Sequence, residues 1–346
     1  MIIHNFPGKI TTLYAVQYPS GSVMLLDSGC ACDKDAAVQH LKALGISETS
    51  VKFVVASHAH PDHAGGASFW QRSGARVAAP QGTNLWYTGI FGWMQHRVDM
   101  GLVFYVEDVA TRSVWRKIRL VMRELVSPSA TVYFPRHIDY DVTIPVPSPV
   151  APDEELSVLV PLVGSGSEDE ATFPELNEWF CVPVPGHTDH MVALWHPLSR
   201  TLYAADTLLH GAHRPKDLQA PVTIDFADLY IQSVERLARL PVCNLLLAHG
   251  GSFRMKSLAA SLDGKDGAEV AAAGETYIGT RMFPGGDWAT KINALAARLR
   301  KDYHERQLSK STGLRGWRAA MVGLLNLPTL LNPRLFRIRR ALKHLR

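Results

Sequence analysis

Residues 57–66 read Ser57-His58-Ala59-His60-Pro61-Asp62-His63-Ala64-Gly65-Gly66, and they place three histidines and a carboxylate within six residues. They follow a short apolar run, 51–56, which is typical of a buried strand. Imidazole nitrogens and carboxylate oxygens are the usual ligands of catalytic zinc. A chain of this composition would contain H-x-H-x-D-H about 0.0015 times by chance. The stretch therefore predicts a metal site at the end of a strand.

The spacing inside the stretch indicates how the ligands are shared. Alternate side chains of an extended chain lie on the same side, so His58 and His60 can converge on one ion. We expect the chain to bend after Pro61. Asp62 and His63 can then reach a second point a few ångströms away.

Three further polar residues stand where an apolar strand is expected to end. His187 follows 179–184, Asp206 follows 201–205, and His249 follows 245–248. The ends of strands in an α/β layer are where functional sites collect. We therefore group these residues with the dense motif.

Strands and helices alternate on both sides of the motif. This alternation is typical of an α/β layered domain. We expect helix from residue 252 to the end of the chain. The expected strands are 10–16, 23–27, 51–56, 76–79, 155–163, 179–184, 192–195, 201–205 and 244–248, and the expected helices are 35–44, 67–72 and 225–240.

The alternation stops near residue 85. Residues 85–126 contain seven aromatic side chains, and the later part has apolar residues at helical spacing. We interpret 85–150 as an inserted, mainly helical segment. Trp86, Tyr87 and Trp93 either cover the cleft and contact an apolar part of the substrate, or pack the insertion onto the rest of the domain.

Composition excludes several classes of protein. The 346 residues are 47% hydrophobic and 20% charged, as in an ordinary globular protein. The sequence has no uncharged apolar run of 18 residues, so it predicts no membrane helix. Residues 1–7 do not resemble a signal peptide. Only four cysteines are present, which favours a reducing, cytoplasmic location over a disulfide framework.

Charge is unevenly distributed along the chain. Residues 298–346 carry thirteen Lys and Arg and two acids, a net charge of +11. Since the whole chain has a net charge of +4, the preceding residues have a net charge of −7. The basic tail, part of a helical extension over 256–346, predicts either contact with an anionic membrane or nucleic acid, or a helical face that is solvated or packed on the body.

These residues together resemble the metallo-β-lactamase-fold hydrolases. The motif at 58–63, His187, Asp206 and His249 match that family's ligand series in order, and Asp27 matches its early strand-end aspartate. The resemblance covers about residues 10–84 and 155–255. It implies a four-layer αββα sandwich formed by 1–84 and 151–255, with the helical insertion and the helical C-terminal extension added to it.

The resemblance also implies a ligand set for two divalent metal ions per chain. Zinc is the first choice, and iron and manganese also suit nitrogen and oxygen ligands. Asp62 and Asp206 would act in catalysis, with a metal-bound hydroxide as nucleophile, and Asp27 would lie behind the ligands. One ion would take His58, His60 and His187, the other Asp62, His63 and His249, and Asp206 would bridge them.

The family's branches differ at the bridging position. In the lactamases proper it is usually cysteine, so Asp206 indicates instead the branch that resembles glyoxalase II and the lactamase-beta-2 protein, whose members are not true β-lactamases. Leu209 replaces the tyrosine usual in acyl-homoserine lactonases. We expect hydrolysis of a thioester or related ester of a small acyl-type substrate, with a metal-dependent nuclease (RNase) or a lactonase as the alternative.

Overall fold

The computed structural model describes residues 1–83, 140–146, 159–164, 166–211, 214–221, 224, 227–256, 276–277 and 281–310. Strand residues in the first sheet alternate between two apolar surroundings. Val23 and Leu25 pack toward helices, whereas Met24 and Leu26 pack toward a second sheet. Both faces of these strands are therefore buried, which explains why they read as continuous apolar runs.

The first sheet is mixed. Its strands β1 to β3 pair antiparallel, and β3 to β6 pair parallel. Helices α1 (Lys34–Ala43) and α3 (Ala67–Arg72) pack on its outer face through Leu41 and Trp70. In spatial order the strands are β13 (Thr276–Tyr277), β1 (Ile2–Pro7), β2 (Thr12–Gln17), β3 (Val23–Leu26), β4 (Val51–Val55), β5 (Arg76–Pro80) and β6 (Val142–Ile144).

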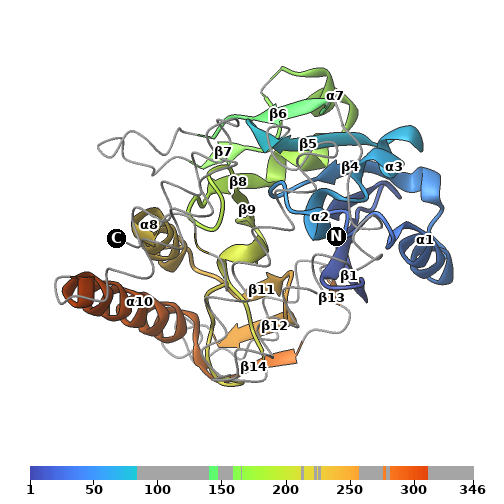
Figure 1. The fold of residues 1–346 in the computed structure, drawn as a ribbon. Coiled ribbons are helices and arrows are strands. Elements are labelled where there is room, and N and C mark those ends of the chain that lie inside the picture. The colour runs from blue at the N-terminus through green and yellow to red at the C-terminus, as the bar shows by residue number, and fades with distance from the viewer. Residues whose placement is uncertain are drawn as a thin grey trace, which may run out of the picture.

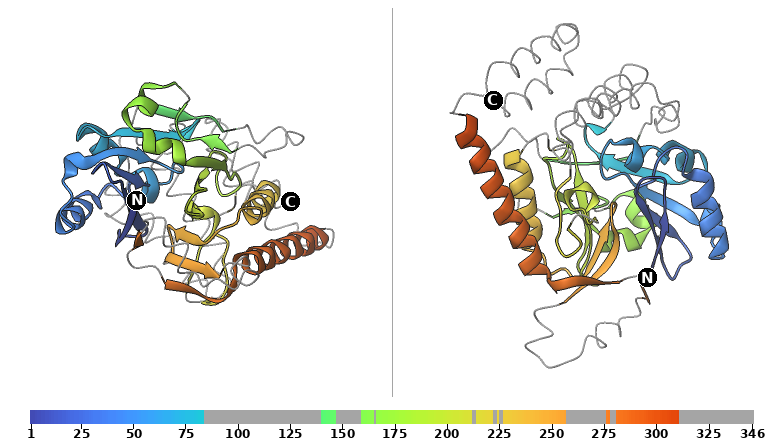
Figure 2. Two further views of the ribbon diagram at one scale, coloured as in Figure 1. Left: turned by 180° about the vertical axis from the view of Figure 1, so that it is seen from behind. Right: turned by 60° about the horizontal axis from the view of Figure 1, so that its bottom comes forward.

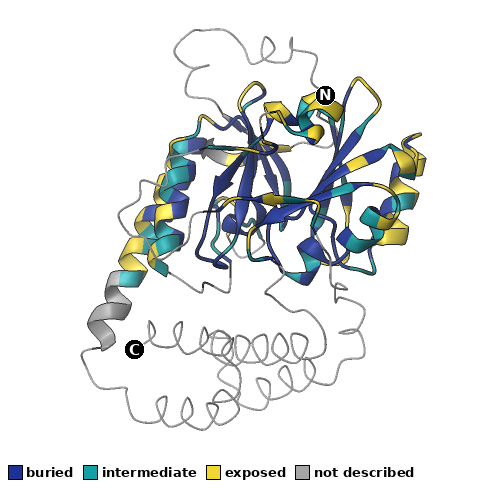
Figure 3. Cartoon of the chain, turned by 90° about the horizontal axis from the view of Figure 1, so that it is seen from above, coloured by how far each residue is buried: buried dark blue, intermediate teal, exposed yellow. Residues whose placement is uncertain are grey.

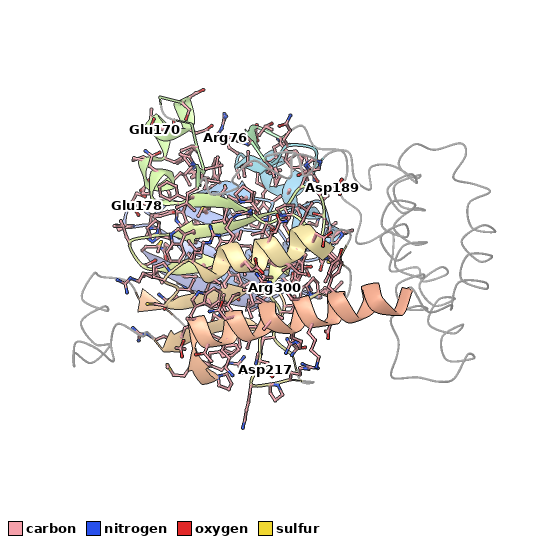
Figure 4. All side chains as sticks on the ribbon, turned by 90° about the vertical axis from the view of Figure 1, so that its left-hand side faces the viewer. Arg76, Glu170, Glu178, Asp189, Asp217 and Arg300 are labelled. Carbon is pink, nitrogen blue, oxygen red and sulfur yellow. The ribbon has the colours of Figure 1, made fainter. Side chains whose placement is uncertain are left out.

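The second sheet faces the first (Figure 1). Helices α8 (Ala227–Ala238) and α10 (Trp288–Lys310) lie side by side on its outer face (Figure 2). Arg300 of α10 forms an ion pair with Glu235 of α8 (Figure 4). In spatial order the strands are β14 (Arg281–Asp287), β12 (Gly251–Lys256), β11 (Asn244–Leu247), β10 (Thr201–Tyr203), β9 (Val192–His196), β8 (Phe180–Pro183) and β7 (Val160–Pro161).

The main core lies between the two sheets, and Figure 3 shows its buried strands with the helices outside them. Short elements fill the connections. These are α2 (Pro61–Ala64), α7 (Glu168–Thr172) and the 3₁₀ turns η1 (Glu48–Ser50), η3 (Pro174–Glu178) and η4 (Ala205–Thr207). The order helix, sheet, sheet, helix confirms the predicted αββα sandwich.

The structure corrects the sequence prediction after residue 250. We predict helix there, but β12 and β14 extend the second sheet before α10 begins. Gly250 and Gly251 have φ of +133° and +92°, which lets the chain reverse after β11. Phe253 and Met255 are then buried while Arg254 between them is exposed, and this alternation is that of a strand.

Smaller differences concern the first sheet. Strand β1 precedes the first strand that we predict, and α2 begins inside the predicted loop 57–66. Strand β6 lies within the segment that we interpret as an insertion, yet it pairs with β5. The aromatic run 85–126 and the tail beyond residue 310 lie outside the described residues, so the three domain boundaries stay predictions. Among the residues described, no helix is long and apolar enough to cross a membrane.

Candidate metal centre

The dense motif is positioned by the end of β4. His58 follows this buried strand, and His60 is still extended, with φ −62° and ψ 145°. Pro61 then occupies the first turn of α2, where its fixed φ suits a helix start and its missing N–H is not needed. The change from extended chain to helix separates His58 and His60 from Asp62 and His63.

The other three polar residues come from the second sheet. His187 follows β8, Asp206 lies in η4 after β10, and His249 follows β11. Gly186, with φ +135°, precedes His187 directly, and a Cβ there would lie 2.4 Å from Tyr230 Cα. Only glycine fits at this point, so α8 approaches the His187 turn closely.

One group of donor atoms consists of three ring nitrogens and one carboxylate oxygen. His60 Nδ1 lies 2.9 Å from His58 Nε2 and 3.0 Å from His187 Nε2. Asp206 Oδ2 lies 3.3 Å from His187 Nε2 and 4.0 Å from His58 Nε2. All four donor atoms lie within 4.8 Å of one another.

The second group adjoins the first. His249 Nε2 lies 3.4 Å from Asp62 Oδ2 and 3.3 Å from Asp206 Oδ1. His63 Nε2 lies 3.7 Å from Asp62 Oδ2 and 3.1 Å from Asp206 Oδ1. The two oxygens of Asp206 therefore face different groups, Oδ2 the first and Oδ1 the second.

Asp27 lies behind both groups. Asp27 directly follows β3 and has a left-handed backbone conformation with φ of +62°, which is uncommon for a residue other than glycine. The carboxylate accepts from His63 Nδ1 at 2.5 Å, from Ser57 N at 2.6 Å and from Ser57 Oγ at 2.8 Å, and also from the Tyr203 hydroxyl.

These hydrogen bonds determine which ring nitrogens point into the centre. His63 donates its Nδ1 proton to Asp27, so Nε2 is the ring nitrogen that points into the centre. Ser57 Oγ gives its proton to Asp27 and so accepts from His58 Nδ1 at 3.0 Å. Asp27 therefore orients one histidine of each group, directly in one case and through Ser57 in the other.

Burial is deepest at the back of the centre. His58 and His63 are fully buried, whereas the side chains of Asp62 and His249 are 17% and 26% exposed. His60 is half-buried. A substrate would therefore reach the centre on the side of Asp62, His249 and His60.

Burial and mutual charge shift the pKa values of these groups. Burial lowers the pKa of His58 well below its usual range, and the neighbouring His63 and His60 lower it further. Burial, the largest single effect, lowers the pKa of His63 and His249 too, but the neighbouring carboxylates together outweigh it. Asp206, Asp62 and Asp27 raise the pKa of His63 well above its usual range, and Asp206 and Asp62 raise that of His249 to about 9. Burial would raise the pKa of Asp206, but His63 and His249 hold it well below its usual range. A cation bound here would replace the protons on His63 and His249.

The donor set fits divalent metal ions. His63 Nε2 and Asp206 Oδ1 are buried, lack a hydrogen-bond partner and face each other. In the first group three ring nitrogens converge, although one proton can bridge only two of them at a time. Cations would satisfy both features, since all the donors are imidazole nitrogens or carboxylate oxygens.

Every side chain that the sequence predicts as a ligand reaches this centre, and Asp27 lies behind it as expected. Trp86, Tyr87 and Trp93 lie outside the described residues. Sequence reasoning missed Ser57 and Tyr203, the two other residues that hold Asp27. Ser57 stands directly before the motif, but Tyr203 carries no signal because it reads as an ordinary strand residue.

Comparison with known proteins places the chain in a family. A family model described as "Metallo-beta-lactamase superfamily" matches residues 7–249. The structure is similar to a metallo-beta-lactamase family protein from Thermus thermophilus, with a TM-score of 0.53 and 17% identity over 99% of this chain and 91% of that one. An archaeal metallo-beta-lactamase superfamily protein from Sulfolobus tokodaii gives 0.45 and 17% over 86% of this chain and 98% of that one.

Proposed function

The chain belongs to the metallo-β-lactamase superfamily and is a metal-dependent hydrolase, and on this basis we propose that it binds two divalent ions and cleaves a thioester or related ester. The observation that carries the proposal is the position of Asp206. Its two carboxylate oxygens lie 3.3 Å from His187 in one group and 3.1 Å from His63 in the other. A carboxylate in this position can bridge two cations.

We assign His58, His60 and His187 to the first ion, and Asp62, His63 and His249 to the second. Zinc suits this set best, and iron and manganese are compatible with the same donors. When bound, the two ions would supply an activated water molecule and an electrophile for the carbonyl oxygen.

The chain itself contributes orientation and proton transfer. Asp206 holds the two ligand groups in register, and Asp27 keeps the His58 and His63 lone pairs directed inward. Asp62 is the more exposed of the two carboxylates in the centre. We propose that it orients the attacking water, accepts the proton which that water releases, and passes this proton to the leaving group. A thiolate is a good leaving group and needs little such help.

The substrate class rests on residues around the bridge. Asp206 stands where lactamases proper usually have cysteine, and the residues around His187 and Asp206 resemble the glyoxalase II-like branch. Leu209, which pairs with Gln219 in an isolated bridge, offers no hydroxyl to a lactone. We therefore place a small acyl-type thioester before lactones and phosphodiesters.

One experiment tests both parts of the proposal. Metal-free protein is loaded with Zn²⁺, Fe²⁺ or Mn²⁺, its metal content is measured, and turnover is assayed on thioesters, lactones, β-lactams and phosphodiesters. We expect about two ions per chain and the highest kcat/KM on a thioester. Preferred turnover of RNA or of a lactone would replace the substrate class, and absence of bound metal after reconstitution would contradict the whole proposal.

We also propose a cytoplasmic location. The four cysteines are free thiols, and three of them are buried. Thiols in this state are typical of a reducing compartment. Fractionation of the source cells would test this, and recovery of the protein outside the cytoplasm would contradict it.

A further inference from the structure

The metal centre is divided between the two sheets. His58, His60, Asp62 and His63 follow β4 of the first sheet, whereas the remaining ligands follow strands of the second. The distance between the sheets therefore sets the distance between the two halves of each ligand group. Any contact that bridges the sheets beneath the centre bears on metal binding.

Tyr14 makes one such contact. It lies on β2 of the first sheet and is fully buried. Its hydroxyl donates to the carbonyl oxygen of Leu247 at 2.8 Å. Leu247 is the last residue of β11 in the second sheet, two positions before His249.

Tyr203 makes the reciprocal contact. It lies on β10 of the second sheet, three positions before Asp206, and is also fully buried. Its hydroxyl donates to Asp27 Oδ2, at the end of β3 in the first sheet. The same oxygen accepts the Nδ1 proton of His63.

The two tyrosines also contact each other. Their rings pack edge to face with centroids 5.7 Å apart. Burial raises the pKa of both hydroxyls well above the usual range, so both remain protonated donors. Each side chain thus starts in one sheet, crosses the core beside its counterpart, and bonds to the other sheet directly beneath a ligand of the second group.

We propose that Tyr14 and Tyr203 are positioning residues that clamp the two sheets together beneath the metal centre. The proposal rests on the two-metal centre described under Proposed function. Tyr203 secures Asp27 and through it His63, and Tyr14 secures the backbone that carries His249. Both belong to the second group, whereas Asp27 reaches His58 of the first group only through Ser57. The clamp should therefore matter most for the second ion.

Replacement by phenylalanine tests this, because phenylalanine keeps the ring and removes only the hydroxyl. Tyr18→Phe is the matched control. Tyr18 is 5% exposed and lies just beyond the opposite end of β2, roughly 13 Å along the strand from Tyr14. Co²⁺ is the probe, since its visible spectrum reports coordination geometry. Stoichiometry and affinity come from titration against a competing chelator.

We expect Tyr203→Phe to bind its weaker Co²⁺ about tenfold less tightly, with a changed visible spectrum. Tyr14→Phe should lose about threefold, since a neutral hydrogen bond to a carbonyl is weaker than one to a carboxylate. Tyr18→Phe should match the wild type in both measurements. Thermal unfolding of the three metal-free variants measures their general stability. We expect similar Tm values, so that a difference in Co²⁺ binding reflects the ligands and not the stability of the fold.

One result would overturn the inference. If Tyr203→Phe and Tyr14→Phe bind both Co²⁺ ions with the affinity and spectrum of Tyr18→Phe, the clamp does not position the ligands. If Tyr203→Phe does not fold, the Co²⁺ affinity and spectrum of Tyr14→Phe, compared with those of Tyr18→Phe, decide whether the clamp positions the ligands. A wild-type protein that binds no Co²⁺ would instead refute the metal centre itself, and the two failures are therefore distinguishable.

Discussion

The two halves of the metal centre are built in different ways. The half that follows β4 has four ligands in six consecutive residues, placed by an extended segment and one turn of helix. The half from the second sheet has three ligands between residues 187 and 249, each at the end of a different strand. The first half depends on local backbone geometry. The second depends on strand order and on the distance between the sheets.

This difference makes Asp206 the most sensitive position. It is the one ligand of the second half that lies within 4 Å of both groups among the described residues. A displacement of β10, the strand before Asp206, would therefore disturb both ligand groups at once. The predictions below test how far the two halves depend on each other.

The largest effect should come from Asp206→Asn. The amide has nearly the same shape but lacks the negative charge, so it cannot bridge two cations well. We expect bound metal to fall below two ions per chain and kcat/KM to fall about a thousandfold, equivalent to about 4 kcal/mol. Asp228→Asn, on the exposed start of α8, is the control and should keep both values. Equal losses in the two variants would refute the bridging role.

A smaller effect should separate His63 from His249 in metal-free protein. His63 is fully buried against the carboxylates of Asp27 and Asp206, so His63→Asn leaves buried charge without a counterion. We expect this variant to lose about 3 kcal/mol in free energy of unfolding. His249→Asn should lose about 1 kcal/mol, because its side chain is 26% exposed. Urea denaturation in the presence of a chelator measures both, and a reversed order would contradict the ion-pair assignment.

Metal removal should loosen the contact between the halves. A ligand that binds only the folded state stabilises it, by about 2.7 kcal/mol when present at 100 times its Kd. We expect thermal unfolding of the Zn²⁺-loaded protein to shift downward on addition of a chelator and to recover when Zn²⁺ is added back. A Tm that does not respond to either addition would show that the two halves are held together without metal.

The smallest effect should come from a contact outside the centre. Arg300 of α10 pairs with Glu235 of α8, but its side chain is 67% exposed. Exposed pairs contribute less than about 1 kcal/mol. We expect Arg300→Ala to lower the free energy of unfolding by no more than that, with unchanged metal content. A loss of metal in this variant would mean that the outer helices also position the ligands.

The accuracy of the sequence prediction does not follow this division. The elements predicted within a few residues lie in both sheets and on both outer faces: β3, β4, β5, β8, β9, β10 and β11, and helices α1, α3 and α8. These strands are apolar on both faces, and Gly45 directly follows the predicted helix 35–44. Strands β1, β12 and β14 are not predicted. Polar and apolar residues do not alternate regularly in β1 and β14, and these strands gain stability from the neighbours with which they pair. Strand β12 does alternate around Phe253 and Met255, a signal that the sequence prediction missed.

The sequence alone determined the chemistry of the metal centre. The donor types, their order, the dense motif and the apolar strands before each ligand are all local features, and local spacing specifies them. Only the tertiary structure decided how the halves meet. It directed the two oxygens of Asp206 to different groups and brought Tyr203 to Asp27, 176 positions away in the chain. Contacts of this kind leave no pattern in the sequence, because they arise from the packing of one sheet on another.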